Sequence, residues 1–468
     1  MSRNSHFSKP TTQFVVFVFL LITTILSGYW IGWVQSIILA FTLGYMAIAF
    51  EHNLKMEKAV PAVLMSVIIW TQISISGLPV VILHDGHLVA STLEGSIEHH
   101  MGKISSILFF LISAMTIVEL ISLHQGFDLF KKWIRTKNKV TLLYIVSIFT
   151  FFLSATIDNL TTTIVMITLL RKLITNQEER WYFVGLIVIV ANAGGTWLPT
   201  GDLTTTMLWL AGKVTTGELI ESLFLPSLIA AGLPVFVASR FKAFQGNITV
   251  DDTVGTEEEK TKALYPLNML LIGLSVILFA PIFHGITGLP PLFGMLLGLG
   301  LLWYYSEKVH PEETFEKGDR YLFSALHALS RIELASVVFF LGILLAVAGL
   351  ESISALLHAS DWLDRTIPSR EVVIFLLGLL SSVIDNVPLV AGTLSMYHEP
   401  PDSLLWLFIT YCTANGGSML IIGSAAGVAA MGLEKIPFFW YLKKIAWLAF
   451  LGYVAGAASF LALYHLLH

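Results

Sequence analysis

Apolar runs recur along the whole chain, separated by shorter polar segments. A run of about 20 residues is long enough to cross the hydrocarbon core of a bilayer as a helix. The pattern therefore predicts an all-α, polytopic membrane protein with about 11 spanning helices. The predicted spans are 13–28, 33–50, 60–83, 104–123, 182–212, 221–239, 264–284, 291–305, 332–350, 404–432 and 436–465.

The first of these runs has a second interpretation, because a signal peptide also begins with basic residues followed by an apolar stretch. Arg3 and Lys9 precede the run, but no clear small-residue cleavage pattern stands near Ser27 and Gly28. We interpret the run as a first spanning helix.

The segment 140–170 does not fit a simple crossing. Basic residues in 128–139 and 171–180 place both of its flanks in the cytoplasm by the positive-inside rule. A single crossing would put one flank outside, and two crossings need about 40 residues. A hairpin that enters from the cytoplasm and turns inside the membrane satisfies both constraints. The polar run Asp158–Thr163 then lies at the turn, where irregular backbone is tolerated only against protein or water.

Three motifs recur in the same order in the two halves of the chain, which indicates an internal repeat. A second hairpin is predicted at 371–397, and by the same topology it enters from the opposite side. A repeat of this kind is inverted, as in many secondary transporters. The motif pairs are an acid at Glu119 and Glu351, Ile-Asp-Asn at 157–159 and 384–386, and an Asn- and Gly-rich segment at 191–195 and 413–417.

The repeat also predicts the domain organisation and two broken helices. Gly194, Gly195 and Pro199 interrupt the span 182–212, and Gly416 and Gly417 interrupt 404–432. Such residues break helices, and broken helices expose carbonyls that coordinate cations near the midplane. The expected parts are N-terminal spans at 1–50, a first repeat half at 51–239, a cytoplasmic linker at 240–262 and a second repeat half at 263–468.

Composition narrows the function class. The chain is 55% hydrophobic and 13% charged, and its formal net charge is −5 without a basic tract, which argues against nucleic acid as a partner. The single Cys412 excludes a multi-cysteine metal site. No phosphate-binding loop is present, so an ion gradient rather than ATP must drive transport. No cofactor and no catalytic role are expected. Four histidines, His84, His87, His99 and His100, are interpreted as part of a solvated outer loop.

Acids inside predicted spans are candidates for function, because a carboxylate at the bilayer centre costs about 2.5–3.5 kcal/mol on insertion scales. Carboxylate, amide and hydroxyl oxygens suit small hard cations. Glu333 is either a local partner of Arg331 or part of an ion path. The candidates for cation and proton binding are Asp158, Asn159, Thr161, Asp202, Asp385 and Asn386, with Glu119, Ser154, Asn192, Ser381 and Asn415 in support.

A buried carboxylate binds either a proton or a cation, because burial favours its neutral form and a bound cation favours its ionised form. Competition for one group is the basis of cation/proton exchange. The two halves need not contribute equally: Asp202 has no acidic counterpart, and Ser418 and Ser424 are the polar groups nearby in the second half. We therefore expect an asymmetric site centred on Asp158 and Asp202, with Asp385 as partner.

At these motifs the sequence resembles the NhaD-type sodium/proton antiporters, within a superfamily that includes dicarboxylate and arsenite carriers. The similar blocks are 151–166, 191–209, 339–351, 383–391 and 416–432. The resemblance implies exchange of Na⁺ or Li⁺ for H⁺ across a bacterial inner membrane by a homodimer embedded in lipid. It also implies a fixed scaffold and a moving transport domain. The ion-binding positions of the family fall on Asp158, Asn159, Thr161, Asp202, Asp385, Asn386 and Ser418.

This chain departs from the family pattern at one broken helix, where Thr196, Leu198 and Thr200 replace Ala, Ser and Ile. The change leaves the choice between Na⁺ and Li⁺ open. Three other functions are weighed. A Na⁺-coupled carrier of a small anion is disfavoured by the acids at both hairpin turns, because anions bind at helix N-termini and uncharged donors. An intramembrane aspartyl protease lacks its flanking motifs, and a passive channel would not need the competing carboxylates.

Overall fold

The computed structural model describes residues 21–49, 56–84, 87–127, 129, 136–248, 264–309, 323–367, 369–383 and 386–467. The chain divides into two compact units, and three helices contribute to both. The first unit comprises Met1–Ser105, Leu334–Trp362 and Ser395–His398, and the second comprises the remaining residues.

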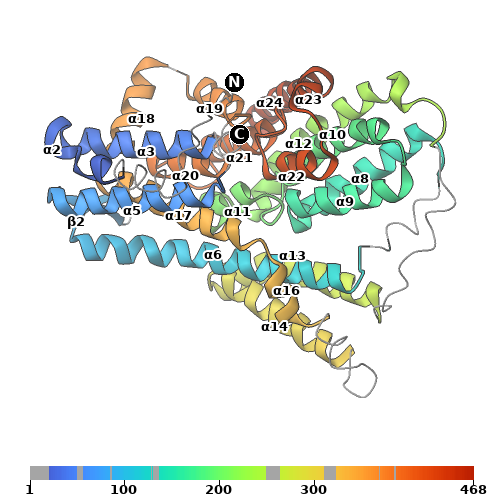
Figure 1. Ribbon diagram of the computed structural model, residues 1–468, viewed down its shortest axis with the longest axis horizontal. Helices are drawn as coiled ribbons and strands as arrows, with labels where there is room; N and C mark the ends of the chain where they lie inside the picture. The colour runs from blue at the N-terminus through green and yellow to red at the C-terminus, as the bar shows by residue number, and fades with distance from the viewer. Residues whose placement is uncertain are drawn as a thin grey trace, which may run out of the picture. The chain divides into compact units, whose positions relative to one another are not determined.

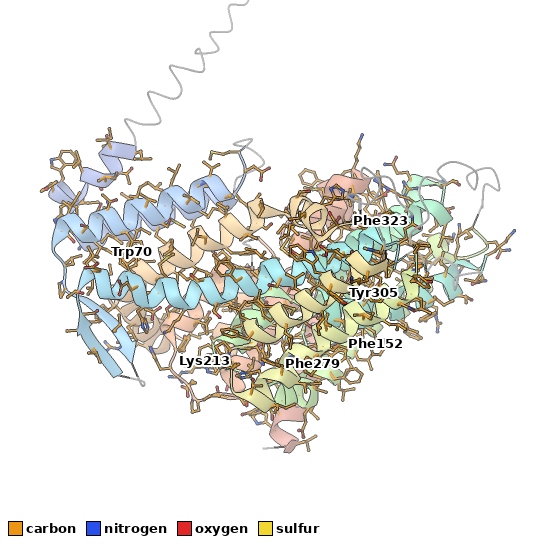
Figure 2. All side chains as sticks on the ribbon, turned by 90° about the horizontal axis from the view of Figure 1, so that it is seen from below. Trp70, Phe152, Lys213, Phe279, Tyr305 and Phe323 are labelled. Atoms are coloured by element: carbon orange, nitrogen blue, oxygen red, sulfur yellow. The ribbon has the colours of Figure 1, made fainter. Side chains whose placement is uncertain are left out.

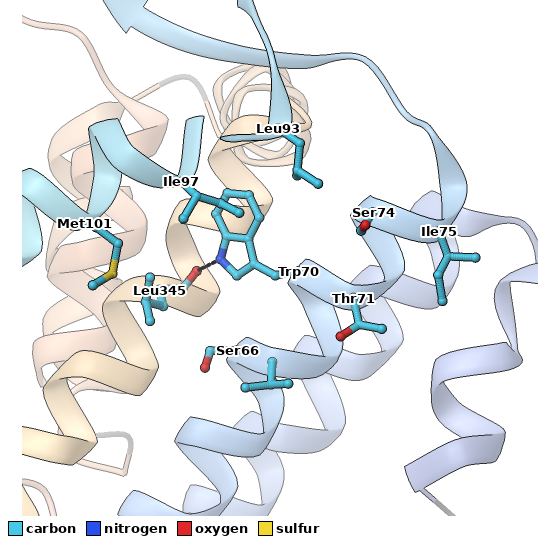
Figure 3. A pocket seen from close by; sticks show the side chains of 10 residues that line it. Ser66, Trp70, Thr71, Ser74, Ile75, Leu93, Ile97, Met101 and Leu345 are labelled. Atoms are coloured by element: carbon cyan, nitrogen blue, oxygen red, sulfur yellow. Dashed lines mark hydrogen bonds between the residues drawn. The ribbon is translucent and has the colours of Figure 1, made fainter. Parts of the chain in front are cut away.

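The first unit is built around α5 (Ala59–Ser76), which packs against α3 (Trp33–Ala49) and α17 (Leu334–Ser352). Gly342 permits the close approach of α17, because a Cβ there would lie 2.6 Å from the carbonyl carbon of Ala62. Trp70 donates from its indole nitrogen to the Leu345 carbonyl (2.9 Å), beside an apolar cavity of about 450 Å³ (Figure 3). The unit also contains α2 (Gly28–Ile31), β1 (Val80–His84), β2 (His87–Ser91), the start of α6 (Leu93–Leu123) and most of α18 (Ala355–Thr366).

The second unit contains the first predicted hairpin, most of the second and both broken helices, with helices α8, α9, α10 and α22 beside one another (Figure 1). Its first part has α8 (Lys139–Ile157), α9 (Asn159–Leu173), α10 (Gln177–Gly194), α11 (Leu203–Leu210), α12 (Thr216–Ala238) and η1 (Lys242–Phe244). Next along the chain, at the start of the predicted second half, lie α13 (Pro266–Thr287), α14 (Pro291–Val309) and α16 (Ala325–Arg331). The last part has α19 (Arg370–Leu380), α20 (Asn386–Met396), α21 (Leu404–Gly416), α22 (Ala425–Glu434), α23 (Phe438–Lys444) and α24 (Ala446–Leu467).

Seven of the described helices are long and apolar enough to cross a membrane, which confirms a multi-pass membrane protein. Their outward surfaces are rich in hydrocarbon side chains such as Phe152, which is 50% exposed, and Phe279 (Figure 2). The re-entry of the two hairpins into a membrane and the number of spans stay predictions. Residues 13–20 of the predicted first span 13–28 and residues 249–262 of the linker 240–262 lie outside the described residues.

Both predicted helix breaks are present, but the region after the third span differs from the prediction. In the first broken helix α10 ends at Gly194 and α11 begins at Leu203, and in the second α21 ends at Gly416 and α22 begins at Ala425. The predicted span 60–83 instead ends at Ser76, because Gly77 adopts a left-handed conformation (φ +62°).

The outer loop predicted at 84–102 is likewise wrong. Its first residues pair in the hairpin of β1 and β2, in which His84 lies opposite His87. The rest forms the first turns of α6, which begins at Leu93 and carries His99 and His100. His100 is buried, and its Nε2 lies 3.2 Å from the Ser352 hydroxyl, so it is not part of a solvated loop.

Candidate functional site

Asp158 lies at the turn between α8 and α9 and caps the second helix. Its Oδ1 accepts from the Thr161 amide (2.7 Å), and its Oδ2 accepts from the Thr161 hydroxyl (2.9 Å). These contacts satisfy an amide at the N-terminus of α9, where a negative charge is also favoured by the helix dipole. The backbone of Asp158 has φ 88° and ψ 155°, a conformation unusual for a residue with a side chain. Such strained positions are concentrated at functional sites.

Asp202 occupies the corresponding place in the first broken helix, where it caps α11. Its Oδ2 accepts from the Thr204 amide (3.0 Å) and from the Thr204 hydroxyl. The residue is only 2% exposed. Both candidate acids of the first half are thus held as helix caps, and their positions depend on where the helices restart.

The carboxylate of Asp202 is shared by the two hairpins. Asn159, the first residue of α9, donates from Nδ2 to Asp202 Oδ1 (2.5 Å). Asn386, the first residue of α20, donates from Nδ2 to Asp202 Oδ2 (3.4 Å). The asparagines of the two Asp-Asn motifs, 227 positions apart in the chain, therefore meet on one buried acid.

The two broken helices bind each other through asparagine side chains. Asn192 of the first donates to the Ser424 hydroxyl of the second (3.2 Å). Asn415 of the second donates to the Thr196 hydroxyl of the first (3.2 Å). Asn192 also accepts from Asn159 (3.1 Å). The contacts between the two broken helices and those around Asp202 therefore form one hydrogen-bond network. We call the set Asp158, Asn159, Asn192, Asp202, Asn386 and Ser424 the carboxylate–amide cluster.

The supporting serines join each hairpin to its own broken helix in matching ways. The Ser154 hydroxyl donates to the Ala191 carbonyl (2.6 Å), and the Ser381 hydroxyl donates to the Thr413 carbonyl (2.9 Å). The glycines that follow allow equivalent backbone approaches. A Cβ on Gly194 would meet the carbonyl of Phe151, and one on Gly416 would meet that of Gly378.

Three other predicted residues have different surroundings. Arg331, the partner considered for Glu333, instead forms an ion pair with Glu119 (2.8 Å). Glu333 itself is exposed in the turn before α17, which places it outside the cluster. The Ser418 hydroxyl donates to the Asn415 carbonyl (2.7 Å) within the break of the second helix. Asp385 lies outside the described residues.

Sequence reasoning missed the contact that Thr196 makes with Asn415. It named both Ser418 and Ser424 as polar groups near the missing counterpart of Asp202, and the structure distinguishes them. Ser424 caps α22 with φ −141° and ψ 155°, and Asp202 caps α11 with φ −141° and ψ 147°. The two residues are therefore equivalent in the repeat. Both follow a Gly-Gly pair by the same interval, Gly194-Gly195 in one half and Gly416-Gly417 in the other, a signal that the sequence contains.

The described side chains of the cluster offer carboxylate, amide and hydroxyl oxygens, the ligands of hard cations such as Na⁺ and Li⁺. Among the described residues there is no group of three or more His, Cys, Asp or Glu side chains that would suit a transition metal. Thr162 and Thr163, in the first turns of α9, are fully buried, and neither hydroxyl has a hydrogen-bond partner within the described chain. Burying such groups is costly, which is consistent with a polar species visiting this region.

Comparison with known families gives a consistent match over most of the chain. A family profile described as a citrate transporter matches residues 45–414. The sodium/proton antiporter 1 of Arabidopsis thaliana is 42% identical over 95% of this chain and 75% of the relative. The sodium/proton antiporter 2 of the same plant is 40% identical over 91% of this chain and 99% of the relative.

Bacterial relatives and a solved structure extend the match. The Na⁺/H⁺ antiporter NhaD of Vibrio cholerae is 33% identical over 92% of this chain and 91% of the relative. The crystal structure of the YdaH transporter of Alcanivorax borkumensis superposes with a TM-score of 0.57 over 86% of this chain and 97% of that chain. Sequence identity there is 12%, so this likeness concerns the fold alone.

Proposed function

Because this chain belongs to the family of NhaD-type sodium/proton antiporters, we propose that it exchanges Na⁺ or Li⁺ for H⁺ across a bacterial inner membrane. The observation that carries the site assignment is the buried Asp202 carboxylate, which accepts hydrogen bonds from the asparagines of both hairpins. Asp158 adds a second carboxylate one residue from Asn159. We assign Asp385 to the same site as a partner acid.

The groups that donate hydrogen bonds to Asp158 leave its carboxylate able to bind either a proton or a cation. Its described contacts are with the neutral amide and hydroxyl of Thr161, which orient the carboxylate without supplying a positive charge. A carboxylate oxygen has two lone pairs, so each oxygen keeps acceptor capacity for an ion. A proton or an alkali cation can then neutralise the group, and the two ions exclude each other.

The cluster lies entirely within the second compact unit. We propose that this unit is the transport domain and that the active assembly is a homodimer in the lipid bilayer. A transport domain that moves as one unit must keep its ion-binding side chains together. The hydrogen bonds among Asn159, Asn192 and Ser424 supply that cohesion.

Everted membrane vesicles that contain the protein test the proposal. Addition of Na⁺ or Li⁺ to vesicles with a preset pH gradient should dissipate the gradient between about pH 7 and pH 9. Because protons compete for the carboxylates, the Na⁺ concentration for half-maximal exchange should fall as pH rises. Asp158→Asn and Asp385→Asn should each abolish exchange at normal expression, whereas the exposed Asp361→Asn controls for the same chemical change.

The matched citrate transporter profile makes a Na⁺-coupled anion carrier the second candidate. Acids at the hairpin turns would repel a tricarboxylate, so the antiporter is favoured on electrostatic grounds. Labelled citrate uptake in the same vesicles separates the two. Na⁺-dependent citrate uptake without dissipation of the pH gradient would replace the antiporter proposal.

A further inference from the structure

Glu434 is a buried acid at the end of α22 that the proposed ion chemistry does not use. Its side chain is 0% exposed. One carboxylate oxygen, Oε1, accepts from Arg171 Nε (2.6 Å), and the other, Oε2, accepts from Arg180 Nε (2.8 Å). We call Glu434, Arg171 and Arg180 the arginine–glutamate cluster. Charge-assisted bonds of this kind are roughly twice as strong as neutral ones.

The backbone at the end of α22 is held by the same elements. The Glu434 carbonyl accepts from Gln177 Nε2 (3.0 Å) and from Trp181 Nε1 (3.0 Å). The Arg171 guanidinium also donates to the Leu433 carbonyl. Carbonyls at a helix C-terminus lack partners within the helix, so side chains of α9 and α10 complete this end.

The three helices joined by this cluster also meet at the cation site, at their other ends. Asn159 begins α9, Asn192 lies in the last turn of α10, and Ser424 caps α22. These residues are hydrogen-bonded in series, from Asn159 to Asn192 and from Asn192 to Ser424. The helices pack on one another along their lengths (Figure 1).

The bonds among Asn159, Asn192 and Ser424 form one layer across the three helices, and the arginine–glutamate cluster forms a second. The spacing between these layers is the same in α9 and α10. Twelve positions separate Asn159 from Arg171, and twelve separate Arg180 from Asn192. With a rise of about 1.5 Å per residue, each layer lies about 18 Å from the other. In α22, ten positions separate Ser424 from Glu434, or about 15 Å. Three helices bonded at both ends cannot slide along their axes without breaking contacts in one layer.

We infer that Glu434 is a positioning residue for the cation site: with Arg171 and Arg180 it fixes the axial register of α9, α10 and α22. It thereby sets where Asn159, Asn192 and Ser424 lie around the carboxylates. The inference rests on the proposed function, because its effect is read at a Na⁺ site. It joins the two repeat halves, since Arg171 and Arg180 belong to the first and Glu434 to the second.

The test compares four variants in proteoliposomes, with Na⁺-dependent stabilisation against heat as a second measurement on the purified protein. Glu434→Gln removes the shared acceptor charge, and Arg171→Gln removes one of the two donors to that carboxylate, from a side chain that is 44% exposed. Arg171→Lys keeps the charge. Glu178→Gln is the matched control, because it removes an exposed charge in the first turn of α10.

Glu434→Gln should raise the Na⁺ concentration for half-maximal exchange about 10-fold or more, and Arg171→Gln about 3- to 10-fold. The maximal rate of Arg171→Gln should stay within about twofold of the parent, and Arg171→Lys should recover part of the loss. The thermal stabilisation by Na⁺ should shift to higher concentration in parallel. Glu178→Gln should match the parent in every measurement.

A folded Arg171→Gln protein with unchanged half-saturation in both measurements overturns the inference, even where Glu434→Gln fails to fold. A parent protein that shows neither exchange nor stabilisation with Na⁺ or Li⁺ instead overturns the proposed function, and the positioning role with it. The two failures are therefore distinguishable.

Discussion

The two repeat halves have similar backbone geometry but different polar side chains at the site. Each hairpin is bonded to its broken helix through a serine, and each broken helix restarts at a cap with nearly the same dihedral angles. At that cap the first half has Asp202 and the second has Ser424. Asn386 accordingly donates across the repeat to Asp202, whereas Ser424 accepts from Asn192. The repeat therefore does not duplicate the site; it brings both hairpins to one carboxylate.

The two broken helices also differ in the contacts that hold the end of α22 and the loop after α11. The end of α22 is held by the buried Glu434 and two arginines. The loop after α11 is held by Asp402, whose amide donates to the Lys213 carbonyl (2.9 Å) and whose Oδ1 accepts from the Thr215 amide (2.6 Å). The carboxylate at the end of α22 is thus bonded to two cationic side chains, whereas the carboxylate after α11 accepts from a neutral amide.

The largest difference between the two halves should come from removing the polar group of each cap. Asp202→Asn keeps the shape and removes the charge that both asparagines face, so exchange should fall about 100-fold. Ser424→Ala removes two neutral hydrogen bonds, from Asn192 and from the Gly427 amide, and should cost about 2- to 10-fold. Vesicle assays normalised to folded protein measure both. Equal losses in the two variants would show that the halves contribute alike.

The two hairpin asparagines should differ less, but in a defined order. Asn159 bonds to Asp202 at 2.5 Å and also to Asn192, whereas Asn386 bonds to Asp202 at 3.4 Å. Asn159→Ala should raise the Na⁺ concentration for half-maximal exchange about 10- to 30-fold, and Asn386→Ala about 3- to 10-fold. Na⁺ titrations at fixed pH measure the order. A larger effect of Asn386→Ala would reverse the asymmetry that we infer.

The smallest effects should be equal in the two halves, because they concern the shared scaffold. Ser154→Ala and Ser381→Ala each remove one buried hydrogen bond from hairpin to broken helix, at a cost of about 1 kcal/mol of stability. Thermal unfolding in detergent measures this. Ser459→Ala is the control, since that hydroxyl bonds within its own helix. A loss confined to one half would mean that the hairpins are attached differently.

The periodicity of the chain was sufficient to locate most helices and both helix breaks. Gly194, Gly195 and Pro199 cannot continue a helix, so the break in the first half is a local property of the sequence. The start of α6 was missed because Glu94, Glu98 and Lys103 resemble a solvated loop, although helices are equally able to carry them. The strands β1 and β2 are not predicted, because the apolar run 80–83 continues the hydropathy of the preceding span. Gly77 and Pro79 are the local signals that the helix ends before it.

The candidate acids could be predicted because a carboxylate in an apolar span is costly enough to require a function. Their partners could not. Glu434 stands at the end of an apolar run, 263 positions from Arg171, and nothing local connects them. Glu333 is a candidate partner of Arg331 by its place in the sequence, yet Arg331 pairs with Glu119.

By itself the sequence predicts a multi-pass membrane protein, the places where its helices break and the acids that are candidates for ion binding. These are local consequences of hydropathy, of backbone freedom at Gly and Pro, and of the cost of burying a charge. Only the tertiary structure decided that Asn159 and Asn386 share Asp202 and that Glu434 joins the two halves. Those contacts depend on how distant helices pack, and packing is a property of the whole fold rather than of any one segment.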